Sequence, residues 1–141
     1  METITRNMKD YLKAIYSLEK GEARVKTTEL AKVLCIAPAS VTEMIRKIAT
    51  KGLVVYKSYR GVRLTGEGRM VVFGVLRKHR LMEKLLVDFV GMDASSACDE
   101  ASKLELAVSD KAANGICAAF GHPATCPCGK PIFRDEDCCG G

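Results

Sequence analysis

The chain has 141 residues, of which 48% are hydrophobic and 28% are charged, a composition typical of globular proteins rather than disordered ones. This length allows one ordinary domain, or two small units that share a core. No run approaches the roughly 18 apolar residues of a membrane-spanning helix, and the first residues lack the apolar segment of a signal peptide. We therefore expect a cytoplasmic protein without a membrane partner.

The net charge of +5 is distributed unevenly along the chain. Residues 1–80 hold 17 Lys and Arg against 7 Asp and Glu, a net charge of +10, whereas residues 81–141 hold 5 against 10, a net charge of −5. A basic half suits a polyanion such as DNA, because neutralised phosphates release condensed counterions. Charge alone fits a solvated surface equally well.

Three helices are predicted in the first third of the chain. Apolar residues at three- and four-residue spacing indicate an amphipathic helix over roughly 4–20, which ends at Gly21. Thr27 is a suitable N-cap for a short second helix, and after a turn Pro38 suits the first turn of a third helix. That third helix, about 38–51, should bury Val41, Ile45 and Ile48.

Two short β-rich runs follow the third helix. Residues 53–57 and 62–65 flank the glycine-containing turn 58–61, a pattern that predicts a β-hairpin. Three helices and a hairpin make a winged helix-turn-helix, in which the third helix enters the major groove and the wing follows the phosphates. We assign this DNA-binding domain to residues 1–66.

The rest of the chain is predicted to be helical, so the protein is mainly α. Residues 67–90 form a long helix with a wide apolar stripe, which indicates a dimerisation surface or, alternatively, packing on its own domain. Further helices are expected over about 95–108 and 109–120. We assign residues 67–123 to a helical dimerisation and metal-binding domain, and residues 124–141 to a Cys-rich tail.

Several segments in this order resemble the diphtheria toxin repressor family of metal-dependent transcriptional regulators over nearly all of residues 5–133. The segments are YLKAIY at 11–16, APASVT at 37–42, GLV at 52–54, YRGVRLT at 59–65, RKHRL at 77–81, DEA at 99–101 and GKPI at 129–132. The family's optional SH3-like domain has no room here, so the chain resembles the short, two-domain form.

The resemblance implies a homodimer that binds a palindromic operator in double-stranded DNA. We expect neither an enzyme nor a small-molecule substrate, because the two His and the scattered carboxylates form no nucleophile–base set. Ser40 and Glu43 are the expected base readers, while Thr27, Thr28 and Arg60 would hold phosphates. The full set of expected DNA-binding residues is Thr27, Thr28, Ala37, Ala39, Ser40, Thr42, Glu43, Arg46, Lys47 and Arg60.

One metal site of the family is implied by His79, Glu83 and Cys98. His79 and Glu83 are four residues apart and therefore share one face of the long helix. Position 98 is usually His in the family, and the cysteine found here is also a ligand for soft or borderline metals.

The family's second metal site is depleted. Asp10 and Glu105 are suitable ligands, but Ser102 is a weak neutral donor and Leu106 cannot coordinate at all. Lys13 stands where manganese-selective members tend to carry a carboxylate, which argues against a dinuclear manganese site. We expect a divalent transition metal, with Fe²⁺ favoured and Mn²⁺ or Zn²⁺ left open.

The C-terminal cysteines could compensate for the missing ligands. They are Cys126, Cys128, Cys138 and Cys139. Thiolates favour zinc, ferrous iron or an iron–sulfur cluster over manganese, although the same cysteines could form a flexible reduced tail. Cys35 and Cys117 lie in apolar contexts and are expected in the core.

Three functions are weighed. The leading one is a regulator whose metal and operator DNA enhance each other's binding. The second is a redox or iron–sulfur-sensing regulator that uses the C-terminal cysteines. The third is a metal-binding protein whose helix-turn-helix contacts other proteins, which the basic first half disfavours.

Overall fold

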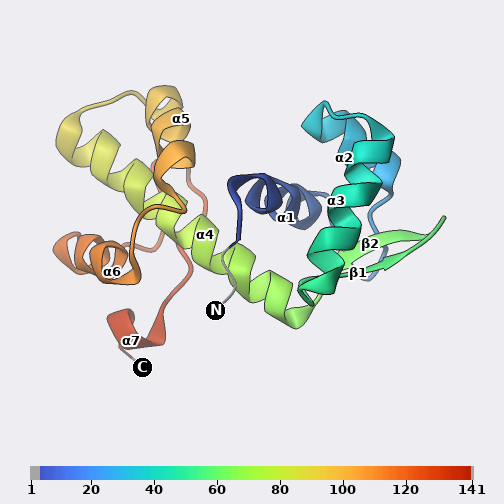
Figure 1. Cartoon of the computed structure of the whole chain (residues 1–141). Helices are drawn as coiled ribbons and strands as arrows, with labels where there is room; N and C mark the ends of the chain where they lie inside the picture. Colours follow the sequence, from blue (N-terminus) through green and yellow to red (C-terminus); the bar gives the residue numbers. More distant parts are fainter. Residues whose placement is uncertain (1–3, 141) are drawn as a thin grey trace. The chain divides into compact units, whose positions relative to one another are not determined.

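The computed structural model describes residues 4–140 and confirms a mainly helical protein (Figure 1). The chain forms two compact units, the first ending at Val72 and the second beginning at Phe73. This division falls within α4 (Gly66–Leu85), about two turns after the boundary expected at residue 66. No helix within residues 4–140 is long and apolar enough to cross a membrane.

The first unit has the predicted order of elements, shown from blue to green in Figure 1. It contains α1 (Arg6–Leu18), α2 (Thr27–Leu34), α3 (Pro38–Thr50), β1 (Val54–Lys57) and β2 (Gly61–Leu64). The two strands are antiparallel, with Val54 opposite Leu64. The winged helix-turn-helix is therefore confirmed.

Aliphatic side chains from all three helices and the hairpin form the core of this unit. Each stabilises the fold by roughly 1.5–3 kcal/mol when fully buried. The inward face expected of α3 is confirmed, because Val41, Ile45 and Ile48 are all 0% exposed. The fully buried set is Leu12, Ile15, Leu30, Val41, Ile45, Ile48 and Val62.

Two expectations about α2 are wrong. Its N-cap is Lys26, which makes no side-chain capping bond, and Thr27 is already the first helical residue. Cys35, expected in the core, is exposed because it ends α2 in a left-handed conformation with φ 55°. The left-handed residue after a helix belongs to the turn and not to the helix face that packs inward.

The wing has a third partner that periodicity did not reveal. Val25 exchanges two backbone hydrogen bonds with Val62, with N···O distances of 2.7 and 2.8 Å. Gly61 precedes this contact with φ +106°, and a Cβ there would lie 2.4 Å from the Val25 carbonyl oxygen. Only glycine combines this dihedral with so close an approach.

Glu19 ties the end of α1 to the wing and to α4. One carboxylate oxygen accepts a hydrogen bond from the Leu64 amide at 2.8 Å. The other pairs with Arg69 at 2.7 Å, and the Glu19 side chain is only 8% exposed. This buried carboxylate therefore fixes the wing against the helices that precede and follow it.

The second unit contains the remainder of α4 and four shorter elements. Asp93 and Ser109 cap the helices that follow them, by accepting hydrogen bonds from Ser96 and Ala112 amides. The first of these helices ends at residue 104, earlier than the expected 108, and the last was not expected. The elements are η1 (Leu86–Val90, a π-helical turn), α5 (Ala94–Leu104), α6 (Asp110–Ala119) and α7 (Glu136–Cys139).

The Cys-rich segment folds back on the second unit rather than forming a loose tail. Phe133 stacks on Phe73 with ring centroids 4.4 Å apart, and the Arg80 guanidinium lies 5.2 Å from the Phe133 centroid. Arg80 also donates a hydrogen bond to the Pro131 carbonyl oxygen. The core of the unit is completed from this segment and comprises Leu81, Ala113, Cys117, Cys126 and Ile132.

The apolar stripe of the long helix is mostly buried within the chain. Five of its residues are covered in the single chain, namely Val72, Val75, Leu76, Leu81 and Met82. They therefore stabilise the fold of the chain and do not form a free surface. Exposed apolar residues lie near both ends of the expected helix, with Met70 69% exposed near its beginning and Phe89 80% and Val90 55% exposed near its end.

Candidate metal centre and DNA interface

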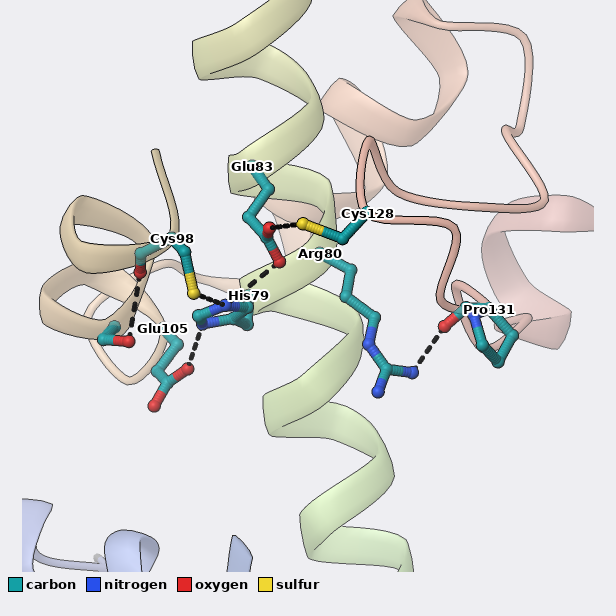
Figure 2. A network of polar contacts seen from close by, with 8 residues as sticks. His79, Arg80, Glu83, Cys98, Glu105, Cys128 and Pro131 are labelled. Atoms are coloured by element: carbon teal, nitrogen blue, oxygen red, sulfur yellow. Dashed lines mark hydrogen bonds and ion pairs between the residues drawn. The ribbon is translucent and has the colours of Figure 1, made fainter. Parts of the chain in front are cut away.

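A buried histidine lies between two buried carboxylates in the second unit (Figure 2). His79 Nδ1 is 2.6 Å from Glu105 Oε2, and His79 Nε2 is 3.0 Å from Glu83 Oε1. All three side chains are less than a tenth exposed. An ionised carboxylate can only accept a hydrogen bond, so Glu105 holds a proton on Nδ1 and directs Nε2 towards Glu83.

A cysteine completes a three-ligand cluster on the Nε2 side. Cys98, on α5, has its Sγ 3.5 Å from His79 Nε2. The ligand atoms of His79, Glu83 and Cys98 all lie within 4.8 Å of one another. Zn–N and Zn–S bonds of about 2.0 and 2.3 Å require N···S separations of about 3.5 Å in a tetrahedral site. The cluster therefore fits a first-row divalent cation.

The other oxygen of Glu83 faces the Cys-rich segment. Cys128 Sγ lies 3.5 Å from Glu83 Oε2, and the hydrogen bond to this carboxylate, together with its negative charge, raises the pKa of the Cys128 thiol. Cys126, which is buried, belongs to the same group of potential ligands. Glu83 thus stands between the His79 cluster and two further thiols, and Figure 2 shows Cys128 approaching it from the opposite side to Cys98.

The first unit presents a groove between α3, the wing and the beginning of α2. The groove has a volume of about 490 Å³ and is lined by Lys26, Thr27, Thr28, Thr42, Arg46, Tyr56, Ser58, Tyr59 and Gly61. A second, open concavity of about 610 Å³ follows the exposed face of α3 and is lined by Ala39, Thr42, Glu43, Arg46, Lys47 and Thr50. Free amides at the first turn of a helix favour phosphate oxygens, so the beginning of α2 suits a nucleic-acid backbone.

Two family models match the chain, one over each of its halves. The model for the iron dependent repressor N-terminal DNA binding domain matches residues 3–62. The model for the iron dependent repressor metal binding and dimerisation domain matches residues 65–134. The chain belongs to the iron-dependent repressor family. Its two domains are the DNA-binding domain and the metal-binding and dimerisation domain of this family of metal-dependent transcriptional regulators.

Individual relatives agree with this membership. An uncharacterised helix-turn-helix transcriptional regulator of Methanocaldococcus jannaschii is 42% identical over 77% of this chain and 87% of its own length. The diphtheria toxin repressor of Corynebacterium diphtheriae is 31% identical over 94% of this chain. The chain spans only 58% of that repressor's length.

Solved structures show the same architecture. A hypothetical protein from Sulfolobus solfataricus has a TM-score of 0.80 at 30% identity, with coverage of 93% of this chain and 100% of that one. A manganese-dependent transcriptional repressor in complex with manganese has a TM-score of 0.80 at 37% identity, with coverage of 91% and 59%.

The residues expected at the family's second metal site have other contacts here. Glu105 is bonded to His79, and Ser102 Oγ donates to the Cys98 carbonyl oxygen at 3.1 Å within α5. In the first unit, Asp10 is about half exposed and its carboxylate is 3.4 Å from Lys9 Nζ. A second metal site on Asp10, Ser102 and Glu105 stays a prediction. The structure assigns Glu105 a role in orienting His79.

The four C-terminal cysteines do not share one site. Cys126 and Cys128 lie beside Glu83, whereas Cys138 and Cys139 lie beside Cys117 and His122. The two pairs therefore belong to different groups of potential ligands, and metal or redox chemistry at these cysteines stays a prediction. Neither Cys117 nor His122 was expected to be a ligand, although the Cys-x4-His spacing was visible in the sequence.

Two thiols of the second group differ in acidity. Burial, followed by hydrogen bonds and repulsion from the neighbouring thiols, raises the pKa of Cys117 to about 12. A backbone hydrogen bond from Asp135, aided by Cys117, His122 and Arg77, lowers the pKa of Cys139 to about 6 despite some desolvation. The pKa values of the two thiols are thus shifted in opposite directions.

The residues expected to contact DNA lie at or near the two concave surfaces, and their contact with DNA stays a prediction. Most line the groove or the α3 face, while Ala37, Ser40 and Arg60 are exposed nearby. The Thr42 hydroxyl donates a hydrogen bond to the Pro38 carbonyl oxygen within α3, at 3.2 Å. The structure adds groove residues that periodicity could not identify, namely Lys26, Tyr56, Ser58 and the fully exposed Tyr59.

Proposed function

We propose that this chain is a metal-activated transcriptional regulator that binds a palindromic operator as a homodimer, with Fe²⁺ as its physiological metal. The observation that carries the proposal is the buried His79–Glu83–Cys98 cluster in a chain whose other unit is a winged helix-turn-helix. Metal and operator would each increase the affinity for the other, as linkage requires.

The choice of metal rests on the chemistry of the donor atoms. An imidazole, a carboxylate and a thiolate suit Fe²⁺ or Zn²⁺, whereas Mn²⁺ prefers oxygen ligands. Cys98 and the neighbouring Cys128 add sulfur donors on both sides of Glu83. We therefore favour iron over manganese for this member of the family, with zinc as the competing metal in the test below.

Each buried group would have a separate task in holding the metal. His79 supplies Nε2, and Glu105 fixes the tautomer that makes Nε2 available. Glu83 supplies a carboxylate oxygen and Cys98 a thiolate, so α4 and α5 would be joined at the site. The bound cation supplies positive charge, which offsets the buried negative charge of these ligands.

DNA recognition would use the exposed face of α3 and the groove beside it. Ser40 and Glu43 would read base edges, and Arg46 and Lys47 would contact phosphates or bases in the major groove. Thr27 and Thr28 at the first turn of α2, and Arg60 in the wing, would hold the backbone. Two copies of α3 in a twofold dimer would match two half-sites one helical turn apart.

The proposal includes no catalytic reaction, and it places the protein with DNA in the cytoplasm. Support comes from membership in a family of DNA-binding regulators. In addition, each ring nitrogen of His79 already has a carboxylate partner, Glu83 at Nε2 and Glu105 at Nδ1.

The test is operator binding with and without metal in protein prepared without oxygen. Duplexes selected from a random pool by the Fe²⁺-loaded protein would be measured by fluorescence anisotropy, in Fe²⁺, Zn²⁺, Mn²⁺ or a chelator. We expect binding at least tenfold tighter with Fe²⁺ than with chelator, and loss of that gain in His79→Ala. Equal affinity in Fe²⁺ and in chelator would refute metal activation, and a response to Zn²⁺ alone would refute the choice of iron.

A further inference from the structure

A second cluster of potential metal ligands lies between α6 and α7, in the C-terminal part of the second unit. It consists of Cys117 on α6, His122 in the following turn, and Cys138 and Cys139 on α7. Cys117 is buried, its two cysteine partners are partly buried, and His122 is exposed. The cluster shares no residue with the His79–Glu83–Cys98 group.

Three separations within the cluster match those of a tetrahedral site, and all its ligand atoms lie within 4.8 Å of one another. Cys117 Sγ lies 3.4 Å from His122 Nδ1 and 3.8 Å from Cys139 Sγ, and Cys138 Sγ lies 3.8 Å from His122 Nδ1. A tetrahedron with Zn–S and Zn–N bonds of about 2.3 and 2.0 Å has edges of about 3.8 Å between sulfurs and 3.5 Å between sulfur and nitrogen.

The backbone is shaped to bring these four side chains together. His122 has φ +56° and follows Gly121, at φ +70°, so two successive residues turn in the left-handed region. The His122 amide donates to the Cys117 carbonyl oxygen at 2.8 Å, which returns the chain over the end of α6. A non-glycine residue in this region is strained and is often found at functional sites.

The short helix α7 is held by its two cysteines, which pack against the core of the second unit, and by the hydrogen bond of the Cys138 thiol to the Asn114 carbonyl oxygen at 3.4 Å. It has four residues, none of which is buried, and isolated helices of this length are unstable in water. Its first turn is capped by Asp135, whose carboxylate accepts from the Cys138 amide at 3.1 Å. Nevertheless α7 lies beside α6 (Figure 1), and both of its cysteines face the cluster.

A buried positive charge stands next to the cluster. The Arg77 side chain belongs to a residue only 6% exposed, and its Nε and Nη2 atoms have no hydrogen-bond partner among residues 4–140. Its guanidinium lies near the Cys139 thiol. A buried cation with two hydrogen-bonding nitrogens left without a partner is costly. Three thiolates, one neutral imidazole and Zn²⁺ carry a net charge of −1, which would offset the charge of Arg77.

We propose that Cys117, His122 through Nδ1, Cys138 and Cys139 form a closed, structural zinc site that fixes α7 to α6. Four protein ligands leave no open position, and three sulfurs with one imidazole are a common set for structural zinc. Zinc binding deprotonates the thiols that are still protonated and releases those protons to solvent. The site stabilises the C-terminal segment and is separate from the metal that would control DNA binding.

The test uses a background in which the other ligand groups are disabled. A His79→Ala, Cys128→Ser double variant lacks one member of the His79–Glu83–Cys98 group and one of the Glu83–Cys126–Cys128 group, and the ligand variants below assign the metal that it retains. Prepared without oxygen, it should retain one zinc per chain by elemental analysis. Replacement by Co²⁺ should give strong tetrahedral d–d bands and thiolate charge-transfer absorbance. Because the other metal centre is absent, failure here is distinguishable from failure of the proposed function.

Two further variants and one control assign the ligands. Adding Cys139→Ser or the exposed His122→Ala should abolish retention of the zinc, whereas adding Cys35→Ser, an exposed cysteine of the first unit, should leave it unchanged. Hydrogen exchange of amides 134–139 should slow on zinc addition only in chains with the four ligands, and unchanged exchange elsewhere would show that the rest of the fold is intact.

Three results would overturn the zinc site. They are absence of zinc with weak, octahedral-type cobalt bands, a Cys117–Cys139 disulfide in protein never exposed to oxygen, and iron with inorganic sulfide in place of zinc. Retention of zinc in Cys139→Ser would overturn the ligand assignment.

Discussion

Glu105 Oε2 lies 2.6 Å from His79 Nδ1, and this contact determines which nitrogen of the ring is presented to Glu83 and Cys98. Glu105 is 1% exposed, so the contact lies in a region of low dielectric where a charged hydrogen bond is strong. Carboxylate partners of this kind fix the tautomer of a metal-binding histidine and raise its basicity.

Replacing Glu105 by Gln should therefore weaken metal binding without unfolding the protein. The amide side chain has nearly the same shape but no charge, and loss of such partners typically reduces metal affinity about 10–100-fold. Isothermal titration of oxygen-free protein with Fe²⁺ would measure the change.

The matched control is Glu100→Gln on the same helix, whose carboxylate pairs with Lys103 at 3.0 Å on a more exposed surface. It should leave the affinity unchanged. An unaltered affinity in Glu105→Gln would show that Glu105 does not orient His79, whereas complete loss of metal would indicate that Glu105 is itself a ligand.

Arg46 lines both concave surfaces of the first unit and is exposed. Its replacement by Ala should lower operator affinity and reduce the magnitude of the slope of log K against log salt concentration by about 1, as expected for one lost phosphate contact. Lys111→Ala serves as the control, because it removes one exposed positive charge from α6 in the other unit. A salt slope that Arg46→Ala leaves unchanged would exclude a phosphate contact, and a change confined to one base position would show base reading instead.

The sequence predicted the winged unit well because its signals are local. The apolar spacing of α3, the Pro38 start and the glycine-containing turn each act within a few residues, and all agree with the structure. The Thr27 cap failed because several residue types can begin a helix, and Lys26 does so here without a side-chain bond. The pairing of Val25 with Val62 was missed because it joins residues far apart in sequence.

The metal ligands were predictable only in part, for the same reason. His79 and Glu83 share a helix face, and a resemblance supplied Cys98. The division of the cysteines depends on how the segment after α6 folds back, which no local pattern determines. Periodicity assigned Cys117 to the core, and it is indeed buried. A buried cysteine can also be a metal ligand, and only the structure showed that Cys117 lies beside His122, Cys138 and Cys139.

Gly61 is the residue on which the wing geometry depends. A Gly61→Ala variant would place a Cβ 2.4 Å from the Val25 carbonyl oxygen at φ +106°, so we expect a loss of about 1–3 kcal/mol in the free energy of unfolding. Gly21→Ala is the control, because Gly21 also has positive φ, +62°, but nothing lies near its added Cβ. Urea denaturation would compare them. Equal losses in the two variants would attribute the effect to backbone strain alone.

Asp93 gives α5, and hence Cys98, a pH-dependent cap. Its carboxylate accepts hydrogen bonds from the Ser96 amide and hydroxyl at 2.9 and 2.8 Å. These bonds, led by the one from the Ser96 amide, lower the pKa of Asp93 in the folded protein. A lowered folded pKa means that the carboxylate stabilises the fold above its unfolded pKa of about 3.9, and that this contribution is lost as the pH falls through the folded value.

Asn also caps helices but does not titrate. The stability difference between the wild type and Asp93→Asn should therefore be constant from pH 7 to pH 5 and should shrink towards pH 3, as followed by urea unfolding at each pH. A difference that grows on acidification would contradict the cap, because it would require a raised pKa for Asp93.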